Sequence, residues 1–585
     1  MNNNPRLYLW VGLAFLLWLN YSTWQRDYPP HPAAVTAAVS QTTPSKQPSS
    51  LANSIPQTQQ SGAPAETTPS GAPSSGTTPH GTAAPPPSPA AAAAAAGIPA
   101  VKPAAPANAP LIHVHTDVYD IDISTRGGAL ERVRLLDYAE VKGQAARVQL
   151  ENDASPQTVY LLQSGLTGPG DAPYPNHTAL FDAPRQSYDM EGARQLRVPL
   201  RWSSGGVTVT KTYVFTKGSY GIGLDYTIQN HGAAPWQAAP YAQLYRDDPR
   251  TKSSYFNPNS YAYHGPAIWT GTKYERLEPS KTEYQHFSQM VTDGWIAATQ
   301  NDFVSAVVLP KNAPYLFSSE VSGPEYLLAA LGPQKTVAPG STATIDQTLF
   351  VGPMLHAQLE KIDPSLKYVV GYGYLTILAG PLFWLLSKVH GITGNWGVAI
   401  ILVTILLKLV LYPLSETSGR SMAKMKALGP RIKNIQETYK GDKEKLGRAM
   451  MDIYKREKVN PVSGCLPMIV QIPVFLAFYW VLLYSAEMRQ APFAFWIQDL
   501  SARDPYFILP AIMAVAMFVQ YKLNPTSPDP AQAKIMMIMP IAMSAMFAFF
   551  PAGLVLYYVT NTILGVAQQW NINRRLGIGL MPRKA

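Results

Sequence analysis

Five apolar segments in the C-terminal third of the chain constrain its fold more than any other feature. Each is close to the roughly 20 residues that a helix needs to cross a bilayer. Another apolar segment lies near the N-terminus, and charged residues make up only 14% of the chain. We therefore predict an α-helical multi-spanning membrane protein with six transmembrane helices, over Leu7–Trp24, Asn395–Leu414, Gly464–Tyr484, Tyr506–Tyr521, Ile535–Phe550 and Leu554–Ile572.

The N-terminal region divides into an anchor and a linker. We interpret residues 1–28 as an uncleaved transmembrane anchor, because Trp18, Tyr21 and Trp24 form an aromatic end to its apolar run. A signal peptide is the alternative, since small residues from Ala33 offer a cleavage site. Residues 29–110 are almost all Ala, Pro, Ser, Thr, Gly and Gln. That composition predicts a disordered linker.

Residues 111–355 have the pattern of an all-β domain. Short runs with period-2 alternation, such as Val207–Phe215 and Ile222–Ile228, are separated by Gly, Asn and Pro turns. We predict one large β-sandwich. His113 and His115 share one face of a strand there, but two histidines make a weak metal site, and we predict no metal or cofactor. In residues 356–394, the segment Tyr368–His390 is mixed in character and predicts a helix in the membrane interface.

The distribution of positive charge orients the spans. The loop Ser418–Asn460 contains twelve Lys and Arg residues, and the tail 573–585 contains four and no acid. By the positive-inside rule both are cytoplasmic. Six spans then place both termini in the cytoplasm, and the linker and β domain in a periplasm-like space. The loop 418–460 reads as two amphipathic helices, Ser418–Tyr439 and Lys443–Lys458, which either contact RNA or an acidic protein or are simply solvated.

Lys408 is a charged residue inside a predicted span. Placing it there costs about 2.5–3.5 kcal/mol and indicates a function, although a lysine that snorkels to the interface is the alternative. The predicted spans 395–572 contain no Asp or Glu to pair with it. Other polar side chains within spans would line a wet groove with Lys408 or form ordinary interhelical hydrogen bonds: Thr404, Gln471, Tyr557, Asn561 and Gln568.

The span Ile535–Phe550 is short and rich in methionine. At sixteen residues it is about 24 Å long as a helix, which favours local thinning of the bilayer unless the ends are misplaced. Its methionines suit a surface that accepts many partners, and ordinary packing is the alternative: Met536, Met537, Met539, Met543 and Met546. No P-loop, HExxH, CxxC or GxSxG motif is present, and the single cysteine, Cys465, excludes an internal disulfide.

Several motifs in order closely resemble the YidC membrane protein insertases of the YidC/Oxa/Alb family. The resemblance is dense over about 370–575, and Thr125–Gly128 resembles the Gram-negative form. The motifs that carry it are Gly394–Gly397, Lys408 followed by Tyr412-Pro413-Leu414, Ser421–Met425, Lys458–Pro461 with Gly464-Cys465, Arg489–Phe493 and Phe550–Tyr558.

The resemblance implies a chaperone and insertase for inner-membrane proteins, not an enzyme, that acts alone or beside the Sec translocon. It implies five helices over 395–572 that form the insertase core, and a periplasmic β-supersandwich. It also implies a hydrophilic groove that is open to the cytoplasm and to lipid but closed to the periplasm. The family's groove charge is often arginine, so Lys408 favours simple attraction over bidentate capture. Thr404, Gln471 and Tyr558 match groove or substrate-contacting positions.

We expect the partners to be nascent membrane proteins, the Sec translocon, the ribosome and membrane lipids. Met536, Met539, Met543 and Phe475 are the residues expected along a hydrophobic slide for the client, and the basic residues expected to contact ribosomal RNA are Arg431, Lys433, Arg574 and Arg575. Two rival functions remain open from the sequence. One is a transporter or channel for an anionic solute, and the other is a membrane-anchored carbohydrate-active protein.

Overall fold

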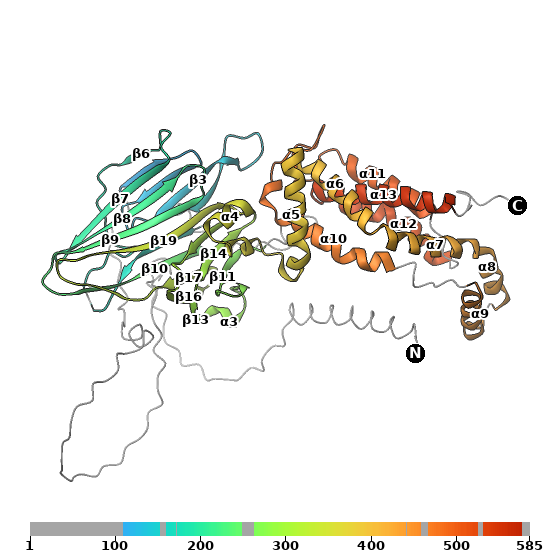
Figure 1. Ribbon diagram of the computed structural model, residues 1–585, viewed down its shortest axis with the longest axis horizontal. Helices are drawn as coiled ribbons and strands as arrows, with labels where there is room; N and C mark the ends of the chain where they lie inside the picture. The colour runs from blue at the N-terminus through green and yellow to red at the C-terminus, as the bar shows by residue number, and fades with distance from the viewer. Residues whose placement is uncertain are drawn as a thin grey trace, which may run out of the picture. The chain divides into compact units, whose positions relative to one another are not determined.

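The computed structural model describes residues 109–152, 159–170, 172–247, 263–439, 441–457, 466–523 and 530–575 (Figure 1). The predicted N-terminal span and almost all of the predicted linker lie outside the described residues. So do Cys465 and the end of the basic tail after Arg575.

The first described region is a β domain of two sheets, as the alternating pattern predicts. Strand β8 (Val207–Thr216) shows the cause, because its side chains alternate between buried and partly exposed. Tyr119 in one sheet donates a hydrogen bond to the carbonyl of Val351 in the other, at 2.5 Å. The sheets therefore pack on a shared core that includes Tyr119, Tyr213 and Phe215.

The larger sheet has eleven strands and the smaller has eight. All described pairings are antiparallel except that of β1 with β6. The larger sheet runs in the order β13 (Ser288–Thr292), β16 (Pro314–Ser322), β17 (Glu325–Leu331), β10 (Trp236–Asp247), β5 (Tyr160–Thr167), β4 (Arg147–Asn152), β3 (Leu130–Ala139), β2 (Tyr119–Ser124), β1 (Leu111–His115) and β6 (Ser187–Asp189), with β18 (Lys335–Val337) beside β10. The smaller sheet runs β12 (Tyr274–Arg276), β11 (Gly265–Trp269), β14 (Trp295–Gln300), β15 (Phe303–Val308), β19 (Thr342–Pro353), β9 (Gly221–Asn230), β8 and β7 (Gln195–Ser204).

Two ionisable side chains in the β domain are fully enclosed. The Lys211 ammonium is 0% exposed and donates to the carbonyls of Gly127, Gly128 and Ser164 at 2.8, 3.0 and 3.1 Å. Glu151 is also 0% exposed and accepts a 2.6 Å hydrogen bond from Ser305. Burial raises the pKa of the Glu151 carboxyl from 4.5 to about 8.

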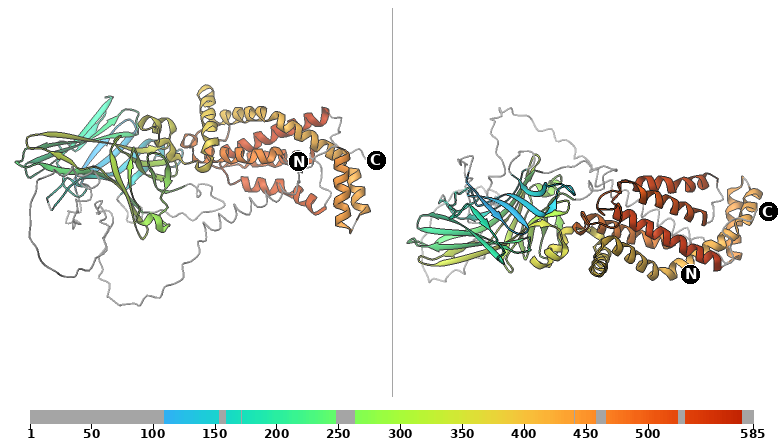
Figure 2. Two further views of the ribbon diagram at one scale, coloured as in Figure 1. Left: turned by 60° about the horizontal axis from the view of Figure 1, so that its bottom comes forward. Right: turned by 90° about the horizontal axis from the view of Figure 1, so that it is seen from above.

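Short helices connect the β domain to the helical region. After α3 (Thr282–Gln285) within the β domain, the connection consists of α4 (His356–Ile362), η3 (Leu366–Val370) and η4 (Gly373–Leu375). The predicted interfacial segment Tyr368–His390 is therefore divided, and its main helix is α5 (Thr376–Thr393). Helix α5 runs across the direction of the helices that follow it (Figures 1 and 2). It exposes Ile377 and Trp384.

The helical region is organised around its last helix, α13 (Ala552–Arg575), whose residues from Ala552 to Tyr557 are all buried. It packs against the other helices of the bundle because Gly419 and Gly553 allow close approach; a Cβ on Gly419 would lie 2.6 Å from Ile572. The remaining helices are α6 (Trp396–Val410), α7 (Tyr412–Ala427), α10 (Leu466–Tyr484), η6 (Ala486–Met488), α11 (Ile508–Leu523) and α12 (Pro530–Phe547).

The predicted continuous span Asn395–Leu414 is wrong in one respect. Helix α6 ends at Val410, and the chain bends by 63° before α7. Pro413 explains the break, because proline disfavours helix interiors but is accepted in a first turn. Lys408 consequently lies in the last turn of α6, where the helix dipole favours a positive charge.

Within the described residues, no helix taken singly has the length and apolar character to cross a bilayer. The bent pair Trp396–Val410 and Tyr412–Ser421 meets both criteria together. Shorter apolar helices occupy Ile469–Tyr484, Ile508–Leu523 and Lys534–Phe547.

The predicted helix Ser418–Tyr439 is also divided. Helix α7 ends at Ala427 and α8 (Gly429–Thr438) begins with Gly429-Pro430, which interrupts the helical hydrogen bonds. Helix α9 (Lys443–Arg456) starts near the predicted position, with Asp442 accepting from the Lys445 amide at 3.0 Å. Ile432 lies in a small cluster with Leu428, Met425, Met450 and Tyr454.

Candidate functional site

A cavity of about 560 Å³ opens among the helices of the second region. It is lined from one side by α6 and α7, from another by α10, and along its length by α13, with α11 and α12 completing the wall. Its lining residues are Lys408, Ser415, Ser418, Gly419, Gln471, Ile472, Phe475, Leu476, Tyr479, Gln520, Met543, Met546, Phe547, Phe550, Leu554, Tyr557, Tyr558, Asn561, Gly565, Gln568, Gln569 and Ile572. We refer to the cavity lined by these residues as the groove. None of these described lining residues is acidic.

Lys408 is a half-buried cation in this groove. A Cβ added to Gly565 would lie 3.8 Å from the Lys408 Nζ and 3.5 Å from the Gln520 Nε2. The glycine therefore leaves space for both side chains. Within the part of the chain that the structure describes, Lys408 has no ion-pair partner. A half-buried charge without a counter-ion is poised to attract an acidic group.

Amide side chains make the groove polar near its centre. The Gln471 Nε2 on α10 donates a 2.9 Å hydrogen bond to the Asn561 Oδ1 on α13. The Gln568 Nε2 is buried and has no hydrogen-bond partner among the described residues. An unsatisfied buried donor costs about 1–3 kcal/mol, so a guest that supplies an acceptor there would recover that energy.

Aromatic rings close one end of the groove. Tyr557 is 1% exposed and stacks on Phe478 with ring centres 4.3 Å apart. Tyr558 contacts Phe547 at 5.0 Å, and Phe550 contacts Tyr479 at 6.2 Å. The groove is therefore polar toward Lys408 and apolar toward the turn between α12 and α13.

The structure brings together most of the residues selected from the sequence, but not all. The groove includes Lys408, Gln471, Phe475, Met543, Tyr557, Tyr558, Asn561 and Gln568. Thr404 does not line it; its hydroxyl is buried and donates to the carbonyl of Ile400 at 2.6 Å. Met536 and Met539 are also absent from the lining. Met539 is 46% exposed on the outer surface of α12.

Sequence reasoning missed several residues that line the groove. Gln520 meets the same criterion as Gln471, because it is a polar side chain inside an apolar segment. Ser415, Ser418 and Gly419 were assigned near or beyond the end of a span, because the bend after Val410 was not anticipated. Gly565 had no signal in a single sequence, because its role is to leave space for Lys408.

The predicted basic contact residues lie away from the groove. Arg431 on α8 forms an ion pair with Glu457 at 2.6 Å, and Lys433 is 3.9 Å from Glu437. Arg574 lies over the Trp570 ring at 5.6 Å, near the end of α13. Exposed ion pairs of this kind are weak.

Two family models match the chain over the regions just described. The model described as "YidC periplasmic domain" matches residues 111–385, and the model described as "60Kd inner membrane protein" matches residues 388–578. The first begins at the start of β1, and the second contains every residue of the groove.

Curated relatives match over nearly the whole length. "Membrane protein insertase YidC" of Cupriavidus necator is 44% identical and covers 98% of each chain. The protein of the same name from Paraburkholderia phytofirmans is 45% identical over 82% of this chain and 88% of its own. A solved structure titled "Active YidC insertase crystal structure with the first transmembrane domain resolved" aligns over 79% of this chain and 94% of that chain, with 19% identity and a TM-score of 0.35. From the family models and the curated relatives, this chain belongs to the YidC family of membrane protein insertases.

Proposed function

We propose that this chain inserts integral proteins into the bacterial inner membrane, and assists their folding, by holding the polar part of a client in the groove. The observation that carries this proposal is Lys408, a cation without an ion-pair partner among the described residues, in a cavity with no acidic lining residue. An acidic or polar segment of a client supplies the missing counter-charge or hydrogen-bond acceptors. Because the site lacks a permanent partner, the client binds and then leaves.

The apolar part of the client follows the surfaces of two helices beside the groove. On α10, Ile469 and Ile472 are 57% and 51% exposed; on α12, Met539 and Met546 are 46% and 49% exposed. Exposed apolar surfaces of this kind suit contact with lipid and with varied apolar segments. Phe475 and Met543 line the groove between these surfaces. We propose that α10 and α12 form the slide along which the client's transmembrane segment enters lipid.

The topology that suits this mechanism has six spans. The N-terminal anchor and the five segments over 395–572 cross the membrane, with both termini in the cytoplasm and the β domain in the periplasm. Helix α12 has 18 residues and is about 27 Å long, slightly less than a hydrocarbon core of about 30 Å. A short helix favours a locally thinned bilayer, which lowers the barrier to a polar segment.

Partners follow from the charges on the cytoplasmic side. The hairpin of α8 and α9, with the basic end of α13, would meet the ribosome that delivers the client. The Sec translocon acts with the protein for some clients.

No cofactor or catalytic chemistry is involved. Apolar burial drives insertion, and the membrane potential contributes about 2.3 kcal/mol per charge per 100 mV.

Photo-crosslinking from Tyr558 tests the proposal. The groove contains Tyr558, so a photoreactive residue there should label the transmembrane segment of a short client on stalled ribosomes, most strongly at intermediate chain lengths. A photoreactive residue at Trp384, 61% exposed on α5 and outside the groove lining, is the matched control. No labelling from Tyr558 at any length, with the protein folded in the membrane, would contradict groove binding.

The two rival functions predict other results. A transporter for an anionic solute would show solute flux in vesicles that contain only this protein, and the flux would depend on Lys408. A carbohydrate-active protein would lose its function when the β domain is deleted and keep it when groove residues are changed. The proposed function predicts neither flux nor that dependence on the β domain.

A further inference from the structure

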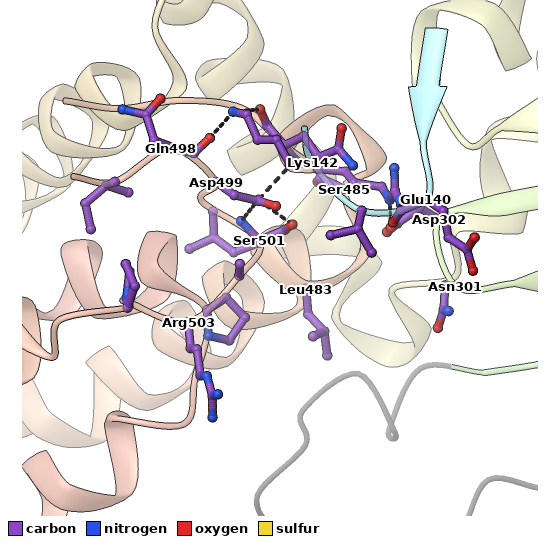
Figure 3. A pocket seen from close by; sticks show the side chains of 18 of the residues that line it. Glu140, Lys142, Asn301, Asp302, Leu483, Ser485, Gln498, Asp499, Ser501 and Arg503 are labelled. Carbon is purple, nitrogen blue, oxygen red and sulfur yellow. Dashed lines mark hydrogen bonds and ion pairs between the residues drawn. The ribbon is translucent and has the colours of Figure 1, made fainter. Parts of the chain in front are cut away.

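A second cavity, of about 650 Å³, is lined by residues that follow closely on those at the aromatic end of the groove. Figure 3 shows this second cavity from close by. We call it the outer cavity. The loop between α10 and α11 forms much of its wall, through Gln498, Asp499 and Arg503, and the loops after β3 and β14 contribute Lys142 and Asp302. Figure 3 shows Lys142 beside Gln498 and Asp499 beside Ser501. The volume is within the range of about 300–1,000 Å³ that ligand sites occupy.

The outer cavity and the groove are lined by neighbouring residues of the same two elements. On α10, Tyr479 lines the groove, while Leu482 and Leu483, one turn later, line the outer cavity. At the turn between α12 and α13, Phe550 lines the groove and the next residue, Pro551, lines the outer cavity. The same two elements therefore face both cavities, and we refer to the Tyr479–Phe550 contact, with ring centres 6.2 Å apart, as the partition.

The turn that carries Phe550 is attached to the outer cavity's own loop. The Ala552 amide donates to the Ala502 carbonyl at 2.7 Å, and the Gly553 amide donates to the Leu500 carbonyl at 2.9 Å. Backbone pairing between Arg503 and Pro551 continues this contact. A displacement of the loop on binding would therefore move the residues beside Phe550.

The groove and the outer cavity both offer polar and charged side chains to a peptide segment that passes from one to the other. The groove offers a single cation and several amides, and ends in aromatic rings. The outer cavity offers charged groups of both signs, including Lys142, Arg503 and Asp499, among loops. A polar peptide segment that passed the aromatic partition would exchange the contacts of the groove for hydrogen bonds and charges immediately beyond it. It would therefore not be left unsatisfied after it leaves Lys408.

We propose that the outer cavity receives the polar segment of the client as it leaves the groove, and that the contact between Tyr479 and Phe550 is the gate between them. The ligand class is a short polar or acidic peptide segment of the translocated chain. This inference rests on the proposed function, since it requires a client in the groove first. It adds a second binding site, the outer cavity, and it predicts that the client occupies the groove first and the outer cavity second.

Crosslinking from both cavities tests the order of occupancy. Photoreactive residues are placed at Tyr558 in the groove and, in a second preparation, at Gln498, whose side chain is exposed on the outer cavity. Both full-length proteins meet the same client, stalled at a series of lengths, and the labelled client residue is identified by mass spectrometry. We expect Gln498 to label the client's polar segment at longer chain lengths than those that give maximal labelling from Tyr558.

The outcomes separate this inference from the proposed function. Labelling from Tyr558 with none from Gln498 at any length would overturn the outer cavity as a receiving site and leave the groove intact. Absence of labelling from both positions would overturn both proposals. Labelling from Gln498 at lengths shorter than those for Tyr558 would overturn the proposed order.

Two variants test the gate and the charge. Phe550→Ala should shift labelling from Gln498 to shorter chain lengths, because the partition loses a ring. Arg503→Glu should lower labelling of an acidic segment from Gln498 several-fold and leave labelling of a neutral segment unchanged. Equal labelling of both segments in Arg503→Glu would contradict a contribution of charge to the site. An unchanged length profile in Phe550→Ala would contradict the gate.

Discussion

Lys211 in the β domain and Lys408 in the helical region are both withdrawn from water, but in opposite ways. Lys211 is 0% exposed, and its ammonium donates to three carbonyls within 3.1 Å. The rings of Tyr213 and Tyr226 lie 5.4 and 5.8 Å from it. Lys408 is half-buried beside a cavity and has no ion-pair partner among the described residues.

This difference distinguishes a structural charge from a functional one. A buried charge with all of its donors satisfied fixes the backbone around it, here the loop at Gly127-Gly128. A charge that faces a cavity and has no ion-pair partner can form an ion pair with an acidic group that enters the cavity. We therefore propose that the β domain uses the Lys211 amine, whose pKa burial lowers to about 7, for stability, and that the helical region uses Lys408 for binding.

Matched methionine substitutions should give the largest contrast between the two lysines. Lys211→Met removes a donor to three buried carbonyls. The Gly128 carbonyl keeps its hydrogen bond from the Tyr213 hydroxyl, and each carbonyl left unsatisfied costs about 1–3 kcal/mol. We expect local stability around Gly127–Gly128 to fall by about 3–5 kcal/mol. Lys408→Met removes a cation without an ion-pair partner from an apolar helix, so stability should change by less than about 1 kcal/mol. Amide hydrogen exchange of the full-length protein in lipid measures both.

The comparison would fail if the two effects were reversed. A large loss of protection in α6 for Lys408→Met would mean that Lys408 stabilises the helical region. An unchanged exchange rate near Gly128 for Lys211→Met would mean that the three carbonyls find other donors.

Glu151 provides a pH test of the same principle within the β domain. Its pKa is raised from 4.5 to about 8 by burial. The folded state therefore holds a proton that the unfolded state has lost between those values, so its contribution to stability is present below about pH 4.5 and is lost as pH rises through about 8. Glu151→Gln, which mimics the neutral acid, should be more stable than wild type at pH 8 by on the order of 3 kcal/mol.

Exchange rates in β4 at pH 5 and pH 8, corrected for intrinsic rates, measure this effect. Glu320→Gln, at an exposed position on β16, is the matched control and should leave the pH dependence unchanged. A Glu151→Gln protein that is less stable than wild type at pH 8 would indicate that burial does not raise the pKa of this carboxyl.

The smallest expected effect on stability, with a clear effect on activity, is at Gly565. Its Cβ position is 3.8 Å from the Lys408 Nζ, so Gly565→Ala is tolerated and Gly565→Leu displaces the lysine from the groove. We expect Gly565→Leu to lower insertion of an acidic client several-fold. Gly380→Leu on α5, where no atom lies within 4 Å of the added Cβ, is the control. Normal insertion by Gly565→Leu would indicate that the position of Lys408 is unimportant.

The sequence predicts most about those features that depend on a local pattern of polar and apolar residues. Period-2 alternation predicted the β domain, and polar residues inside apolar segments predicted Lys408, Gln471, Asn561 and Gln568, all of which line the groove. The strand order was not predictable, because alternation identifies strands but not their partners. The parallel pairing of β1 with β6 depends on contacts between distant segments.

The groove was less predictable at its edges. Thr404 is one turn before Lys408 and was expected beside it, yet its hydroxyl bonds to its own helix. Helical spacing places residues on one face but does not show which face meets a cavity. The bend after Val410 and the space left by Gly565 depend on how helices pack, and a single sequence does not record packing.

Insertion of three matched clients tests the central claim most directly. The clients differ only in one short translocated segment, which is acidic, neutral or basic, and they are presented to wild type, Lys408→Arg and Lys408→Gln in vesicles. Two charges about 4 Å apart interact by about 1–4 kcal/mol between bulk water and an effective dielectric constant of 20. The predicted result is therefore a roughly tenfold or greater loss for the acidic client in Lys408→Gln, little change for the neutral client, and retention of activity in Lys408→Arg. Equal loss for the acidic and neutral clients would contradict the account, because Lys408 would then support the protein's own structure instead of a client's charge.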